Sequence, residues 1–148
     1  MLAFRSSRRR KRQSGHAIVE VAFLCPWILF LFAGTFDVGF CAYSLIATQS
    51  AARVAAQYAS QGPTTAVDQN GVCTWALAEL NTLPGAHGLN SCSANPVIVT
   101  TSKVTGVDGA QAASVSVTYQ TIPLIQIPGF PSRFNITRTA QMRLQTTS

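Results

Sequence analysis

The sequence has few of the residues that catalysis and metal binding need. Among 148 residues there are five acidic residues and two histidines. They suggest no Ser-His-acid trio, no histidine pair at ligand spacing and no glycine-rich phosphate loop after a strand. The four cysteines include no Cys-x-x-Cys pair of the kind that redox enzymes use. We therefore expect no catalytic residue, no metal, no cofactor and no small-molecule substrate.

Acidic residues are also missing from the start of the chain, where basic residues gather. The net charge is +6, and six of the eleven Lys and Arg residues lie in the first twelve positions. The rest of the chain has five basic and five acidic residues. Because a nucleic-acid-binding domain spreads its basic residues over a folded face, we expect no nucleic-acid partner. Residues 1–15 are interpreted as a basic cytoplasmic leader.

A long apolar segment follows the leader. Residues 21–36 carry no charge, and extension to Tyr43 makes the segment long enough to cross a bilayer of about 30 Å. Pro26 is expected to kink the helix rather than end it. The positive-inside rule leaves the leader in the cytoplasm and exports everything after Tyr43. A cleaved secretory signal is the alternative, but its apolar region would be shorter.

Alanine dominates the second half of the predicted helix, which spans residues 16–60 in all. Ala47, Ala51, Ala55 and Ala59 recur at every fourth position. Small residues at this spacing form a smooth ridge on which another helix can pack closely, although alanine also favours helix by itself. We interpret the ridge as a helix-packing surface.

Residues 61–148 are predicted to form a small exported α+β domain. A short helix is expected from Thr74 to Leu83, with Thr74 as its N-cap. Alternating β-branched residues then predict strands at 97–104, 113–119 and 134–144. The prolines of 122–131 indicate a loop or an edge strand. The fold class is thus α+β: a long N-terminal transmembrane helix continues into the exported side and packs with a small antiparallel β-sheet.

The four cysteines divide into two kinds. Cys73 and Cys92 lie in the exported part, where an oxidising compartment makes a disulfide the default. Cys25 and Cys41 lie in the long helix and are read as small apolar residues.

Gly15, His16 and Glu20 connect the leader to the apolar segment. A glycine lets an extended backbone enter a protease site without obstruction, so the Gly15–His16 bond is a candidate cleavage site. A carboxylate in an apolar helix costs about 2.5–3.5 kcal/mol at mid-membrane and less near the interface. Glu20 therefore pairs with a positive group, such as the new α-amine of His16 on a neighbouring subunit, or stays wet near the headgroups. Asp37, at the outer boundary, is either a partner contact or a solvated residue.

These residues resemble the TadE-like family. The resemblance lies in Glu20–Pro26, the run to Gly34, Asp37–Gly39, Tyr43 and Ala51–Ala59. Members are minor pilins, or pseudopilins, of the tight-adherence (Flp-type) pilus machinery of bacteria. The resemblance implies a bacterial inner-membrane subunit that reaches the extracellular pilus after assembly. It also implies cleavage after Gly15 by a membrane prepilin peptidase, with Glu20 needed for processing or assembly.

The partners that the resemblance implies are the peptidase, other pilin subunits and the Tad machinery, besides the membrane itself. The chain departs from the commonest pattern at Val21, where an aromatic residue is frequent, and at Asp37, where glutamate is common. Two other functions are compatible with a membrane anchor. One is an uncleaved scaffold of the secretion platform, and the other is a tethered enzyme that uses Asp37 or the Cys73/Cys92 pair.

Overall fold

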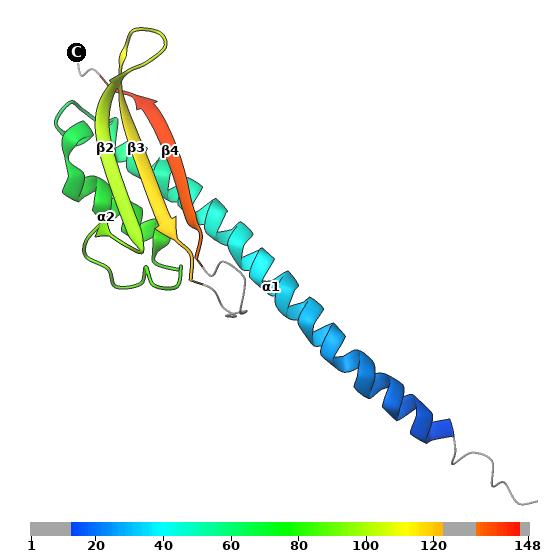
Figure 1. Cartoon of the computed structure of the whole chain (residues 1–148). Helices are drawn as coiled ribbons and strands as arrows, with labels where there is room; N and C mark the ends of the chain where they lie inside the picture. Colours follow the sequence, from blue (N-terminus) through cyan, green and yellow to red (C-terminus); the bar gives the residue numbers. More distant parts are fainter. Residues whose placement is uncertain (1–12, 123–132, 146–148) are drawn as a thin grey trace, which may run out of the picture. The chain divides into compact units, whose positions relative to one another are not determined.

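A computed structural model describes residues 13–122 and 133–145 (Figure 1). Most of the predicted leader and of the predicted proline-rich loop lies outside the described residues. The elements in chain order are α1 (Gln13–Ala59), η1 (Thr65–Val67), α2 (Gln69–Leu80), β1 (Ser93–Ala94), β2 (Val97–Thr105), β3 (Gln111–Gln120) and β4 (Asn135–Arg143). The chain divides into two compact units, Met1–Val38 and Gly39–Ser148. The second unit therefore includes the C-terminal part of α1.

The described part of the first unit is apolar helix. Its large apolar side chains, from Ile18 to Val38, are 55–75% exposed on every side of α1. Pro26 lies within the helix. From His16 to Ala59, α1 is long and apolar enough to cross a membrane. A helix that is apolar all round needs lipid or other helices around it.

The second unit is built on a four-stranded antiparallel sheet in the order β1-β2-β3-β4. Strand β3 shows why these residues form a sheet with two different faces. Its alternate residues Ala113, Val115, Val117 and Tyr119 are fully buried, whereas the residues between them carry hydroxyl groups. This period of two places one face on the core and the other in solvent. Together with the long helix, the sheet confirms the α+β fold class.

Helix α2 begins earlier than the sequence analysis predicts. The side chain of Asp68 accepts a hydrogen bond from the Gly71 amide at 3.1 Å and caps the helix. Thr74 lies inside the helix, where its hydroxyl donates to the carbonyl of Asn70. The prediction of Thr74 as N-cap and of Leu83 as the last residue was therefore wrong. Asn70 and Gly71 are poor helix formers that concealed a capped first turn.

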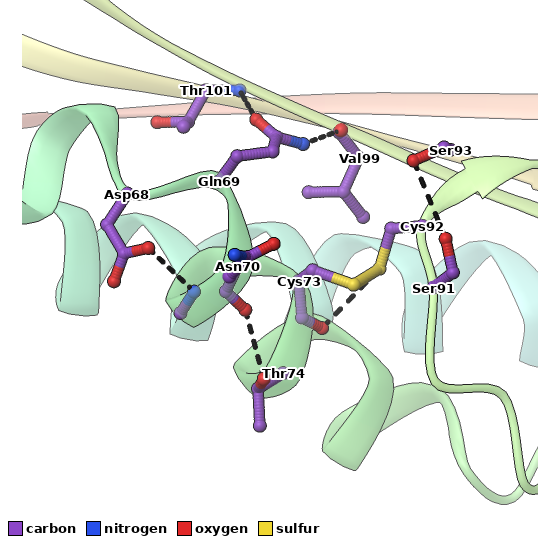
Figure 2. Close-up of a disulfide and its surroundings, with 11 residues drawn as sticks. Asp68, Gln69, Asn70, Cys73, Thr74, Ser91, Cys92, Ser93, Val99 and Thr101 are labelled. Carbon is purple, nitrogen blue, oxygen red and sulfur yellow. Dashed lines mark hydrogen bonds between the residues drawn. A yellow bond between two sulfur atoms is a disulfide. The ribbon is translucent and has the colours of Figure 1, made fainter.

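One side chain of α2 completes the edge of the sheet. Gln69 donates its amide N–H to the carbonyl of Val99, and its Oε1 accepts from the amide of Thr101 (Figure 2). β1 pairs only with Val97 and Ile98, and the Val99 amide donates to the Cys92 carbonyl. The Val99 carbonyl and the Thr101 amide would otherwise lack a partner on this edge. The Gln69 amide therefore substitutes for a peptide group of a neighbouring strand.

Cys73 and Cys92 form a disulfide that joins α2 to the segment before β1 (Figure 2). Both cysteines are buried, and they are 19 residues apart in sequence. A link of this span stabilises the folded chain chiefly by restricting the unfolded one. The second unit is small, and small domains often need such a cross-link.

Replacement of Cys73 and Cys92 together by serine is expected to lower the free energy of unfolding by about 3 kcal/mol. Guanidinium unfolding of the full chain in detergent, followed by tryptophan fluorescence, measures the change. Cys25→Ser is the matched control, since Cys25 is free and exposed in the apolar part of α1. An unchanged midpoint in the double variant would contradict the expected role of the disulfide.

Candidate processing and assembly site

The expected cleavage site lies where α1 begins. Gly15 and His16 are in the first turn of the helix, which starts at Gln13. A first turn has backbone amides without helical partners and frays easily. The structure therefore places the Gly15–His16 bond at the part of α1 that unwinds at least cost.

Glu20 lies one turn further along α1 and is exposed. It borders a shallow apolar hollow with Val19, Phe23 and Leu24. Among the described residues, no cationic group lies within ion-pair distance of its carboxylate. A charge in such apolar surroundings favours any partner that brings a positive group.

Asp37 is also exposed, and it is the second acidic residue of the first unit. Seventeen residues of helix separate it from Glu20, which corresponds to about 25 Å along α1. The two carboxylates therefore cannot contact the same group, and each belongs to a separate surface.

The alanine ridge belongs to the core of the second unit. Ala51, Ala55 and Ala59 are fully buried, and Ala47 is partly buried against the same cluster. This cluster includes residues of α2, β2 and β3, such as Val72, Leu80, Val99 and Val117. The ridge therefore packs within its own chain. A contact with a neighbouring subunit has to use a different face of α1.

Three side-chain hydrogen bonds connect α1 to α2 and to the residues just before and after it. The hydroxyls of Tyr43 and Thr82 lie 3.0 Å apart. Ser50 donates to Glu79 at 2.7 Å, and Tyr58 donates to Asp68 at 2.7 Å. The three bonds are spaced along α1 from its entry into the second unit to its last turn, so they fix both the rotation and the height of the helix.

The contact at Asp68 is the most elaborate of the three. One carboxylate oxygen accepts from the Tyr58 hydroxyl and the other accepts from the Gly71 amide. These two hydrogen bonds lower the pKa of the Asp68 carboxyl and keep it charged. The sequence contains a usable signal for this cap, an aspartate three residues before Gly71, which the analysis above did not use.

Gly71 has no room for a side chain. A Cβ atom there would clash with the Asp68 carboxylate and the Tyr58 hydroxyl. Trp75, one turn further along α2, stacks on the Tyr58 ring with centroids 6.1 Å apart. The contact between the two helices therefore depends on a glycine at this position. We call Tyr58, Asp68 and Gly71 the helix clamp.

The face of α1 that points away from the core is open. Ile46 is 70% exposed, and Arg53 and Gln57 follow it on the same side at helical spacing. Arg53 also lines a hollow with Arg138 of β4. The described residues contain one ion pair, between Arg143 and Asp108, so neither arginine of the hollow has a carboxylate partner there. This outward face was not identified from the sequence.

Comparison with known families identifies the segment that contains these features. Residues 15–57 match the family model TadE, described as TadE-like protein. The resemblance to the TadE-like family is confirmed over these residues. No curated protein and no solved structure matches the chain.

The TadE-like segment coincides with α1 almost entirely. It starts at Gly15 and includes Glu20, Asp37 and Arg53, and it ends one residue before Tyr58. The family implies a part in the tight-adherence (Flp-type) pilus system, and it is not an enzyme family. With the long apolar helix, it indicates a membrane-anchored protein.

Residues that could hold a metal do not gather in the part of the chain that the structure describes. Within residues 13–122 and 133–145, no three His, Cys, Asp or Glu side chains form a possible ligand set. His16 and His87 lie in different units.

Gly71→Ala is expected to open the helix clamp and to lower stability by about 1–3 kcal/mol, because an inserted methyl group displaces Asp68 and Tyr58. Thermal and guanidinium unfolding of the full chain in detergent measure the loss. Gly62→Ala is the matched control, because its Cβ would meet only Thr65 at an ordinary 3.8 Å. A Gly71→Ala protein as stable as the Gly62→Ala protein would contradict the importance of the clamp.

Proposed function

We propose that the protein is a minor pilin, or pseudopilin, that acts in assembly of a tight-adherence pilus. One observation carries the proposal. The TadE-like segment is a single helix that exposes apolar side chains on all sides in the first unit and packs a small-residue face into a folded domain in the second. A pilus subunit needs a helix that can pass from lipid to other helices and an attached domain that stays folded meanwhile.

Processing is the first step of the proposed mechanism. A membrane prepilin peptidase cuts after Gly15, and the new α-amine of His16 lies close to the apolar boundary of α1. Glu20 of a neighbouring subunit pairs with this amine. The pair relieves the cost of holding a carboxylate among apolar side chains, and it fixes the axial position of one helix against the next.

Assembly is the second step. The exposed first half of α1 exchanges lipid for the helices of neighbouring subunits, and the outward face around Ile46 and Arg53 extends this contact into the second unit. Arg53 and Arg138 bind a carboxylate of the neighbour, which their charge and shared hollow favour. Asp37 contributes a separate contact near the end of the first unit.

An uncleaved scaffold of the same machinery is the second candidate. It is favoured by the position of Gly15 within the helix, since a protease needs extended backbone and has to unwind the first turn. The scaffold keeps the membrane anchor and the folded domain but does not use the His16 amine.

Intact mass of the membrane-extracted protein distinguishes the two candidates. We expect a chain that lacks residues 1–15 in cells with the prepilin peptidase, and the full chain in cells without it. Gly15→Leu is expected to block the loss, because a bulky side chain then occupies the scissile position. Gly34→Leu is the control, since Gly34 has open space around it and lies far from the cut. Full-length protein with an active peptidase would favour the scaffold.

Arg53→Glu is expected to reduce the yield of pili and of cross-links between this protein and other pilins, because it repels the proposed carboxylate partner. Folding should be unaffected, since Arg53 is exposed. Lys103→Glu makes the same change of charge at an exposed position of β2 and serves as the control. If both variants assemble equally well, the outward face of α1 is not the subunit contact.

A further inference from the structure

One end of the second unit gathers exposed apolar side chains beside the start of its part of α1. The hydroxyl of Tyr43 contacts Thr82, and the hydroxyl of Tyr119 donates to the carbonyl of Pro84 at 2.7 Å. Through these bonds, the part of α1 near Tyr43 and the end of β3 both contact the short segment Thr82–Pro84 that follows α2. We call this region the Tyr43 end.

The chain before β4 returns to the same region. The Thr121 amide donates to the Phe134 carbonyl, and the Phe134 amide donates to the Thr121 hydroxyl, both at 2.9 Å. The Tyr43 end therefore combines α1, the segment after α2, the end of β3 and the start of β4, as the ribbon shows (Figure 1).

Three large apolar or aromatic side chains are exposed at the Tyr43 end. Phe134 is 54% exposed, Tyr43 48% and Ile122 43%. Arg133 is exposed beside Phe134, and the described segments that meet here (residues 39–43, 82–86, 119–122 and 133–135) contain no aspartate or glutamate. The surface therefore combines large apolar side chains with a positive charge and with neutral polar groups such as Thr82 and Asn135.

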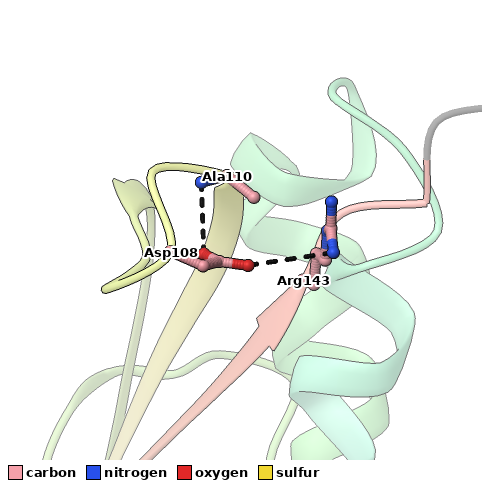
Figure 3. A network of polar contacts seen from close by, with 3 residues as sticks. All are labelled: Asp108, Ala110 and Arg143. Atoms are coloured by element: carbon pink, nitrogen blue, oxygen red, sulfur yellow. Dashed lines mark hydrogen bonds and ion pairs between the residues drawn. The ribbon is translucent and has the colours of Figure 1, made fainter.

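The opposite end of the strands has a different character. The turn between β2 and β3 contains Asp108, which accepts from the Ala110 amide and pairs with Arg143 at 3.8 Å (Figure 3). Val107 at this turn is fully exposed, but it is a single apolar side chain beside a charged pair. The apolar and basic surface is thus specific to the Tyr43 end.

The length of chain that leads to this end limits what can cover it. Val38 is the last residue of the apolar first unit, and Tyr43 follows five residues later. Even a fully extended backbone spans about 17 Å over five residues, whatever the angle between the units. The Tyr43 end therefore stays within reach of the lipid headgroups as long as the first unit is in the bilayer. Tyrosine and other aromatic residues favour this interfacial zone.

We propose that the Tyr43 end rests on an anionic lipid surface before assembly. Phe134, Ile122 and the Tyr43 ring enter the headgroup region, and Arg133 binds lipid phosphate. The domain is then held against the exported leaflet, with its β2–β3 turn away from the membrane. The contact requires the membrane anchor that the two candidate functions share, so it stands whether or not the leader is cleaved.

Tryptophan fluorescence in proteoliposomes tests the contact. The full chain, carrying Trp27→Phe and Trp75→Phe, is reconstituted in phosphatidylcholine with phosphatidylglycerol and a headgroup-labelled quenching lipid. Phe134→Trp is expected to emit at shorter wavelength and to lose intensity to the quencher. Val107→Trp, at the opposite end, is the control and should remain unquenched. Ile122→Trp supplies a second reporter at the Tyr43 end.

Two results would overturn the proposal. Emission from Phe134→Trp and Ile122→Trp that is as insensitive to the quencher as that of Val107→Trp would show that the end does not touch lipid. The second result concerns the positive charge. If Arg133→Glu does not change the quenching, whether or not the vesicles contain phosphatidylglycerol, Arg133 does not bind lipid phosphate. Normal processing or piliation in those same variants would leave the proposed function intact, so the two failures can be told apart.

Discussion

The fold depends on the burial of a face of small side chains on α1. Ala51, Ala55 and Ala59 have no exposed surface, and they belong to the same buried cluster as residues of α2 and the sheet. The large core side chains come from the other elements, among them Leu80 and Tyr119. A larger residue on the alanine face would force these elements apart, because a packed interior leaves little free volume.

This packing has a consequence for the polar contacts. The alanines contribute few atoms and no directionality, so they do not by themselves fix the rotation of α1. Hydrogen bonds at Tyr43, Ser50 and Tyr58 fix that rotation. The partners of these bonds lie in α2 or directly beside it, and the disulfide at Cys73 limits how far α2 can move. Close packing of the alanine face thus holds α1 in the core, and a few specific hydrogen bonds fix its rotation.

The sequence predicted the parts of the fold that have a strong local pattern. β2, β3 and β4 were found within two residues of their ends, because β-branched residues alternate there without interruption. The start of α2 was missed, because its first turn contains Asn70 and Gly71, and its stability comes from the cap at Asp68 and the Tyr58 hydroxyl. The Asp68 cap has a local signal, an aspartate three residues before Gly71, that the prediction did not use. The bond from Tyr58 joins residues ten positions apart, and no local pattern records it.

The alanine ridge shows a related limit. Spacing predicts that a small-residue face packs closely against something, but it does not say whether the partner is the same chain or another one. The choice is made by the domain, which buries the face of Ala55 and leaves Arg53 outside. Glu20 and Asp37 could be found from the sequence, since a charge within or beside an apolar run is conspicuous. Arg138 could not, because its proximity to Arg53 arises only when β4 joins the sheet.

These features separate what can change during the proposed assembly from what cannot. The large apolar side chains of the first unit are more than half exposed. Exposure of apolar surface to water costs about 25 cal/mol of free energy per Å², so the total cost of moving this helix into water would be prohibitive. The helix can therefore leave lipid only by entering contact with other apolar helices. The alanine face is already covered within the chain and is the same in both surroundings. In the assembly proposed above, changes are thereby confined to the first unit, the outward face of α1 and the Tyr43 end, while the core and its clamp stay the same.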